Sequence, residues 1–419
     1  MTYSLKNATY IFFLLMSIEF GGDSILRVFN INIGLIDITF KFLISFTALI
    51  LLASFGFKST IRLPLLLPLL IFIGVILIGL LNGLLINNIV NALKETSSFL
   101  FIALFLSFSV INKPLSVLEV ESFLKVFVYI VSFKVLIYIV ASYLVYDTPS
   151  WKILLKQSPL LLIPISVLFS KISLECKFSK SNILLLVLML VCVVFAQARM
   201  LFLALTIIFL FYFLNRRVFS KGLLIIGLIS ASLWIYWLVT NTGLSSFNES
   251  LYAGKLFEDG LDYRLTQLDV IINRLVESPL LGVGFGHYTP GYLTYGELSK
   301  PYLLELDILN FISKIGLIMT FFYVMAYVLL FRLIRSISDN NVRRLAKSLF
   351  VSLIALLIYS TGQSFHQAYA YWSVLAFIYG FVVSHLRVQN KSVEYSKKRS
   401  LGVAILPSLN EYDVKSINQ

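Results

Sequence analysis

The chain has 419 residues, of which 59% are hydrophobic and 13% charged, and its mean hydropathy is +0.90. Soluble domains carry about 25% charged and 45–50% apolar residues, so this composition excludes a water-soluble globular protein. Fibrous and disordered classes are excluded by the same numbers. The formal net charge of +13 at pH 7 would suit a nucleic-acid partner, but its distribution along the chain indicates membrane topology instead.

Apolar runs of about the length needed to cross a bilayer recur along the chain. Twelve spans are predicted, at residues 8–21, 35–57, 64–86, 97–111, 124–146, 158–170, 182–198, 200–215, 222–240, 304–331, 348–365 and 369–386. The fourth, sixth and eighth runs are short, so a count of ten or eleven spans stays open. The expected fold is therefore an all-α polytopic membrane protein.

Lysine and arginine collect in cytoplasmic loops, so their distribution orients the chain. With the N-terminus inside, 22 of the 34 Lys and Arg residues fall in cytoplasmic segments, nine in outside segments and three within spans. This split favours twelve spans with both termini in the cytoplasm. The basic surplus is then a topology signal, and no nucleic-acid partner is predicted.

One external segment, residues 241–303, differs from the other connections. Its 63 residues carry four Lys or Arg against seven Asp or Glu, the reverse of the rest of the chain. It divides the chain into spans one to nine (1–240), the large loop (241–303), spans ten to twelve (304–386) and a cytoplasmic tail (387–419). Because the other loops are too short to hold a domain, any chemistry outside the membrane is expected in this loop.

Part of the large loop is predicted to be helical. Leu261–Val276 reads as an amphipathic helix, because its apolar residues recur at helical spacing. Pro279 is expected to end it. Three glycines then alternate in the sequence LGVGFGHY: Gly282, Gly284 and Gly286. Glycine tolerates positive φ and close backbone contact, so this stretch must turn tightly or approach something closely.

Three arginines are candidates for binding an anion. Arg199 stands between two apolar runs, which predicts a position at the external membrane boundary. An arginine there either snorkels to the interface or meets an anion, and its planar guanidinium suits phosphate oxygens. Arg264 and Arg274 are ten residues apart on the loop helix, an offset of about 280°, so they do not share one face. For Arg274 a solvated surface charge is the alternative.

Acids, histidines and a tyrosine are further candidates. Glu305 and Asp307 stand at the outer start of the tenth predicted span, where the helix dipole favours acids. Asp307 is assigned mainly to capping, whereas Glu305 is either a helix-end acid or a base that orients an acceptor hydroxyl. His287 and His366, both expected outside, could hydrogen-bond a sugar or phosphate. Tyr288 either stacks on a sugar ring or anchors the chain at the interface.

Two lysines lie within predicted spans. Lys134 and Lys314 are expected to face the interior of the bundle, because a charge in lipid is costly. Either could mark a transport path, which keeps a transporter as a hypothesis. A transporter would bind its substrate near the midplane and depend on these lysines more than on the external loop.

Together these stretches resemble the bacterial O-antigen ligase and polymerase superfamily. An arginine follows a span in AQARMLFLAL, the loop contains DYRLTQLDVIINRLVESPLLGVGFGHY, and the next span contains KIGLI. The stretch from Arg264 through ESPLLGVGFG is the most specific part, and the resemblance covers about residues 185–320. It implies that Arg199 and Arg264 bind an anion.

The ligase branch of this superfamily carries a catalytic histidine, then a polar residue, then nine residues and a glycine. Counting back from Gly316 puts Glu305 at the histidine position and Leu306 at the polar one. The ligase histidine is therefore missing, which favours the polymerase branch.

The resemblance implies a glycosyltransferase of the bacterial inner membrane, with its large loop periplasmic. Its substrate would be oligosaccharide linked to undecaprenyl pyrophosphate, and its partners the bilayer, the flippase and a chain-length regulator. No cofactor or metal is predicted. The expected catalytic residues are Arg199, Arg264 and Glu305, and the expected substrate-binding residues are Arg274, His287, Tyr288 and His366. The alternatives are an O-antigen ligase with a lipid A-core acceptor and, from another class, a lipid-linked oligosaccharide flippase.

Overall fold

The structure is a computed structural model of the chain. It describes residues 62–96, 115–129, 158–175, 184–187, 189–190, 199–214, 253–289, 304, 306–361 and 369–400. Within these ranges all regular structure is helical and no strand occurs, in agreement with the predicted all-α class.

Three helices in the described ranges are long and apolar enough to cross a membrane. They are α4 (Leu63–Ile86), α14 (Asp307–Arg335) and, within α16 (Tyr369–Ser400), the portion Tyr371–Glu394. They coincide with the predicted spans 64–86, 304–331 and 369–386. The predicted spans 8–21, 35–57, 97–111 and 222–240 lie outside the described residues.

The predicted span 348–365 corresponds to α15 (Asn340–Tyr359), which begins earlier than expected. Asp339 caps the helix, because its side chain accepts hydrogen bonds from the amides of Asn341 and Val342 at 2.7 and 3.1 Å. The first two turns of α15 then carry three cations, Arg343, Arg344 and Lys347. The remaining apolar part is short, and α15 is not among the three helices that meet the criteria for a span.

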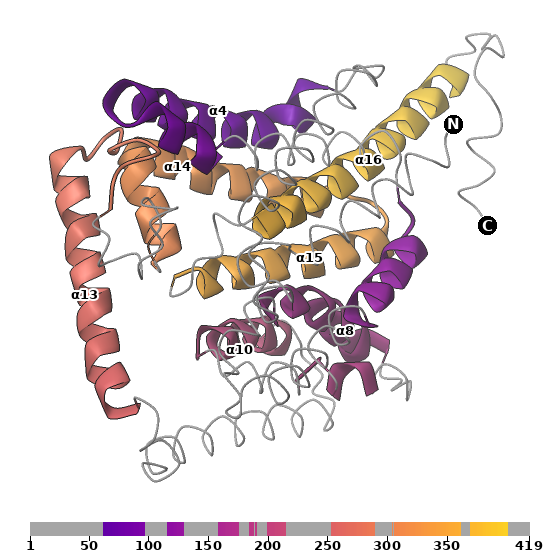
Figure 1. The fold of residues 1–419 in the computed structure, drawn as a ribbon. Helices are drawn as coiled ribbons and strands as arrows, with labels where there is room; N and C mark the ends of the chain where they lie inside the picture. Colours follow the sequence, from indigo (N-terminus) through magenta and orange to yellow (C-terminus); the bar gives the residue numbers. More distant parts are fainter. Residues whose placement is uncertain are drawn as a thin grey trace.

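The helix α15 lies at the centre of the packing. It contacts α14 and α16 and also α8 (Leu162–Glu175) and α10 (Arg199–Leu214), which contact each other. The helix α4 packs on α14, so that Figure 1 shows α4 and α14 at the top, α15 below them and α8 and α10 beneath. One large apolar cluster runs through these helices.

One end of this bundle is rich in cations. Gln389 joins α16 to the turn after α14, because its Oε1 accepts from Ser338 N at 2.9 Å. Arg62, just before α4, pairs with Glu394 of α16 at 3.2 Å. The cations near this end include Arg332, Arg335, Arg343, Arg344, Arg387 and Lys391. All of them belong to segments predicted to be cytoplasmic, so the helix directions are consistent with that topology; the sidedness itself stays a prediction.

The loop helix is α13 (Ala253–Glu277), which is longer than the predicted Leu261–Val276. It ends two residues before Pro279, as expected. Figure 1 shows α13 at one edge of the molecule, crosswise to α4, α14 and α15. Its C-terminal end contacts α14 and leads into the glycine-rich segment.

Candidate active site

The glycine loop, residues 278–289, packs against a groove of small residues on α4. Gly284 has φ of +78°, and a Cβ built on it would lie 2.5 Å from the amide nitrogen of Gly83. The neighbouring Phe285 donates its amide to the carbonyl of Gly79 at 3.1 Å. Gly79 and Gly83 are one helical turn apart, the small-residue spacing that lets backbones approach closely. The predicted close approach is thus confirmed.

The same loop fills a break in α14. At Gly316 the backbone leaves helical geometry, with φ of +73° and ψ of 176°. The amides of Leu317 and Ile318 donate instead to the carbonyls of Pro279 and Leu280, at 2.9 and 3.2 Å. Backbone groups in an apolar environment must be paired, so the loop replaces the missing helical turn.

Two carbonyl groups of α14 just before the break also accept hydrogen bonds from the loop. Ser313 O accepts from the amide of Val283 at 3.1 Å, and Lys314 O accepts from the amide of Gly284 at 2.9 Å. The loop and the interrupted helix therefore each donate backbone hydrogen bonds to the other and accept backbone hydrogen bonds from it. This pairing holds residues 279–284 of the loop against α14.

Two asparagines at the end of α4 hold the loop from the other side. Asn82 Nδ2 donates to Gly282 O at 2.7 Å. Asn87 Nδ2 donates to Val283 O and Phe285 O at 2.8 and 3.1 Å. These two contacts set the orientation of the Asn87 amide, so that its Oδ1 faces the residues beyond the glycines.

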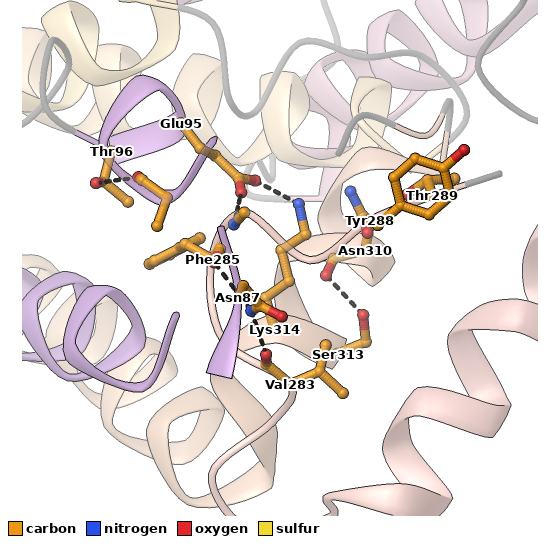
Figure 2. Close-up of polar contacts among 12 residues, drawn as sticks. Asn87, Glu95, Thr96, Val283, Phe285, Tyr288, Thr289, Asn310, Ser313 and Lys314 are labelled. Atoms are coloured by element: carbon orange, nitrogen blue, oxygen red, sulfur yellow. Dashed lines mark hydrogen bonds and ion pairs between the residues drawn. The ribbon is translucent and has the colours of Figure 1, made fainter. Parts of the chain in front are cut away.

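A buried ion pair stands behind the loop (Figure 2). Lys314 Nζ donates to Glu95 Oε1, and both side chains are almost fully buried, at 0% and 1% exposed. The second carboxylate oxygen, Glu95 Oε2, accepts from Gly286 N at 2.6 Å. The expectation that Lys314 faces the bundle interior is confirmed. Glu95 therefore links a cation of α14 to the backbone of the loop.

Arg274 of α13 is buried and bonded within the protein. Its side chain is 3% exposed, and Nη1 donates to Asn310 Oδ1 at 2.9 Å. Nη2 donates to Tyr288 O at 3.0 Å and to Thr289 Oγ1 at 2.9 Å. The alternative of a solvated surface charge was wrong, because three acceptors from other parts of the chain enclose the guanidinium. Nε has no hydrogen-bond partner among the residues that the structure describes.

Burial lowers the pKa of Arg274 to about 10, and the carboxylates of Glu95 and Glu277 oppose this shift. The guanidinium is therefore still a cation at neutral pH. It ties α13, the loop and the first turns of α14 together. It also adds positive charge beside the next candidate, His287.

The predicted substrate-binding residue His287 is partly buried at the end of the glycines. Its Nδ1 lies 3.2 Å from Asn87 Oδ1, which can only accept. The oriented Asn87 amide thus favours the tautomer with hydrogen on Nδ1, and it leaves Nε2 as an acceptor. Burial and then the charges of Arg274 and Lys314 lower the pKa of His287 to about 4. A neutral imidazole whose Nε2 is an acceptor suits hydrogen bonding to a sugar hydroxyl.

His287 is expected to stay neutral where ordinary histidines titrate. The unfolded chain binds this proton near pH 6.5, whereas the folded protein binds it only near pH 4. The contribution of the neutral ring to stability is therefore full above pH 6.5 and is lost as the pH falls towards 4. Nitrogen-15 NMR of the histidine-labelled protein, with the signal assigned by its loss in His287→Gln, should show no titration between pH 7.5 and 5.5. A midpoint near 6.5 would contradict this environment.

The other predicted site residues are described to different extents. Arg199 is the first residue of α10, and its side chain is not among those described. Arg264 is partly buried on α13, and Tyr288 is exposed beside His287. Glu305 and His366 lie outside the described residues. The structure thus brings Arg274, His287 and Tyr288 together and does not test Arg199, Glu305 or His366.

Asp307 lies in the first turn of α14, where the sequence placed it, and it is fully buried. The cap position itself is occupied by Leu306, which makes no side-chain cap bond. The sequence prediction missed Glu95 and Asn87, which orient the loop. The position of Glu95 in the polar stretch KETSS was the one feature of the sequence that could have pointed to it. That stretch does not indicate which residues Glu95 contacts.

A family model matches part of the chain. The model of the O-antigen ligase family matches residues 184–305, under a third of the chain. The matched segment contains Arg199, Arg264 and the glycine loop. It supports a relation to the ligase and polymerase superfamily and a role in polysaccharide synthesis, without separating polymerase from ligase. No curated protein matches the chain.

Proposed function

We propose that the protein is a polysaccharide polymerase, a glycosyltransferase that joins oligosaccharide repeat units carried on undecaprenyl pyrophosphate at the periplasmic face of the inner membrane. One observation carries the proposal. The segment that resembles the O-antigen ligase family holds a loop docked between two candidate membrane spans, and this loop presents His287 beside the buried cation Arg274.

The proposed reaction is a direct displacement at the anomeric carbon of the growing chain. A hydroxyl at the non-reducing end of the incoming repeat unit forms the new C–O bond, and the bond to the carrier pyrophosphate breaks. The hydroxyl proton passes to a base, for which Glu305 is the candidate. Arg199 and Arg264 would stabilise the charge that develops on the pyrophosphate. Such a displacement inverts the anomeric centre, so the polymer linkage should be opposite to the donor linkage.

The ligase is the alternative within this superfamily, and the description of the matching family favours it. The substitution of Glu305 for the histidine of the ligase branch favours the polymerase. A flippase is the alternative from another class. A flippase is expected to depend on Lys314, but Lys314 forms a buried ion pair with Glu95. Loss of Lys314 would therefore disturb the fold of a flippase and of a transferase alike. Substitution of Arg264 is therefore the better test for separating a transferase from a flippase.

Lipopolysaccharide gels test the proposal in the host with the gene deleted. The deletion is complemented with wild type, Arg264→Gln, Glu305→Gln or Arg62→Gln, with the amount of inserted protein measured by immunoblot. A polymerase predicts core capped by a single repeat unit in the deletion strain, and a full ladder with wild type. Arg264→Gln and Glu305→Gln should reduce the ladder at least tenfold. Arg62→Gln, at the opposite end of the bundle, is the matched control and should restore it.

Other results separate the alternatives. Bare core in the deletion strain would overturn the polymerase proposal. Long lipid-linked chains accumulating outside would then indicate a ligase, whereas single lipid-linked units trapped on the cytoplasmic face would indicate a flippase. A normal ladder with Arg264→Gln would remove this residue from the proposed catalytic set.

A further inference from the structure

Over residues 264–277, the outward face of α13 is amphipathic. Leu265, Ile272 and Val276 are exposed, the last at 74%, and their spacing of seven and four residues aligns them in one stripe. The adjacent exposed positions are polar: Thr266, Asp269, Asn273 and Glu277. The opposite side of the helix packs inward and carries Arg274. The outward face is therefore divided lengthwise into an apolar and a polar half.

The apolar stripe does not end with the helix. It continues through the exposed side chains of Leu280 and Leu281 in the following turn. Leu280 is bonded through its carbonyl to the amide of Ile318, next to the exposed Leu317 of α14. One turn further along α14, Phe321 is 61% exposed. The stripe thus joins the outer surface of a helix that is long and apolar enough to cross a membrane.

The direction of α13 fits a position at the membrane surface. Figure 1 shows it crosswise to α4 and α14, at the end of the bundle where α4 ends and α14 begins. A helix that runs across membrane spans lies along the bilayer plane. Helices with divided apolar and polar faces bind in that plane, with the apolar face buried at the boundary of headgroups and acyl chains.

We propose that α13 docks on the lipid bilayer itself. Its stripe of Leu265, Ile272 and Val276 enters the acyl boundary, and its polar half meets headgroups and water. Continuity with the outer surface of α14 selects lipid over a protein partner. Under the proposed function, this docking holds Arg274 and His287 at headgroup depth, where the phosphates of a lipid-linked donor lie.

Depth measurements on neighbouring residues test the docking. In a variant with Cys176 and Cys192 replaced by serine, single cysteines are introduced at Val276 or Glu277 and, as a second pair, at Leu265 or Thr266. Each is labelled with an environment-sensitive nitrobenzoxadiazole dye in nanodiscs of phosphatidylethanolamine and phosphatidylglycerol. Adjacent residues differ by about 100° around the helix, so each pair compares the two halves in one turn.

We expect the labels at 276 and 265 to emit at shorter wavelength and to be quenched at least threefold more by spin-labelled lipids than those at 277 and 266. Iodide should quench the two groups in the opposite order. Equal quenching within both pairs would overturn the proposal. Protection of the apolar-stripe labels from both quenchers would overturn it as well and would indicate a protein partner. The readout needs no catalysis, so it is independent of the gel experiment.

Discussion

Lys314→Met is expected to destabilise the protein by about 3–5 kcal/mol, because it leaves the carboxylate of Glu95 buried without its cation. The same carboxylate holds the amide of Gly286, so the loop should loosen and the polysaccharide ladder should be lost. Thermal unfolding of the purified protein in detergent measures the first effect, and the gel measures the second.

Two further variants make this test specific. Glu95→Gln combined with Lys314→Met removes both charges and should recover much of the stability lost by the single change, since no unpaired charge remains. Arg62→Gln breaks an ion pair whose side chains are 64% and 51% exposed, and should cost about 0–1 kcal/mol. If Arg62→Gln and Lys314→Met lowered stability equally, the buried pair would not have the role assigned to it.

Gly284→Ala should be the second most damaging change. At φ of +78° an alanine costs about 1–2 kcal/mol in backbone strain alone. Its methyl group would also meet backbone atoms of Asn82 and Gly83 at 2.5–2.8 Å, and backbone cannot move aside as a flexible side chain does. We expect α4 to separate from the loop, the melting temperature to fall and the ladder to disappear.

Gly74→Ala is the matched control in α4. A methyl group there has nothing within 4 Å, and alanine favours a helix over glycine by about 0.5–1 kcal/mol. This variant should melt at or above the wild-type temperature and restore the ladder. Wild-type stability in Gly284→Ala would mean that the loop does not approach α4 as closely as the geometry indicates.

The glycine pattern illustrates how far the sequence could predict the site. The alternation of Gly282, Gly284 and Gly286 predicted positive φ or close contact, and both occur. What the glycines approach was hidden, because Gly83 lies some two hundred residues away and hydropathy does not specify which helices are neighbours. The break at Gly316 was hidden for the same reason: a glycine in an apolar run is common, and only the arriving loop makes an interrupted helix stable.

The burial of Arg274 could not be predicted from the sequence. Helical spacing separated this arginine from Arg264, but amphipathicity alone left open whether Arg274 is a solvated surface charge or a binding residue. Its burial depends on Asn310, Tyr288 and Thr289, which come from other elements and supply the acceptors. A cation is buried only where such acceptors meet, and that meeting is a property of the tertiary structure.

The sequence by itself determined the membrane class, the all-α class of the described residues and the positions of the three long apolar helices α4, α14 and α16, and it singled out residues 241–303 as unlike the other connections. These follow from composition and periodicity, which act locally and are set by the lipid or aqueous surroundings of each segment. The tertiary structure decided that Lys314 pairs with Glu95, that Asn87 orients His287 and that the loop completes α14. Such contacts join segments that are distant in the sequence through specific polar geometry. A local pattern of apolar and polar residues does not specify which distant residue a side chain will contact.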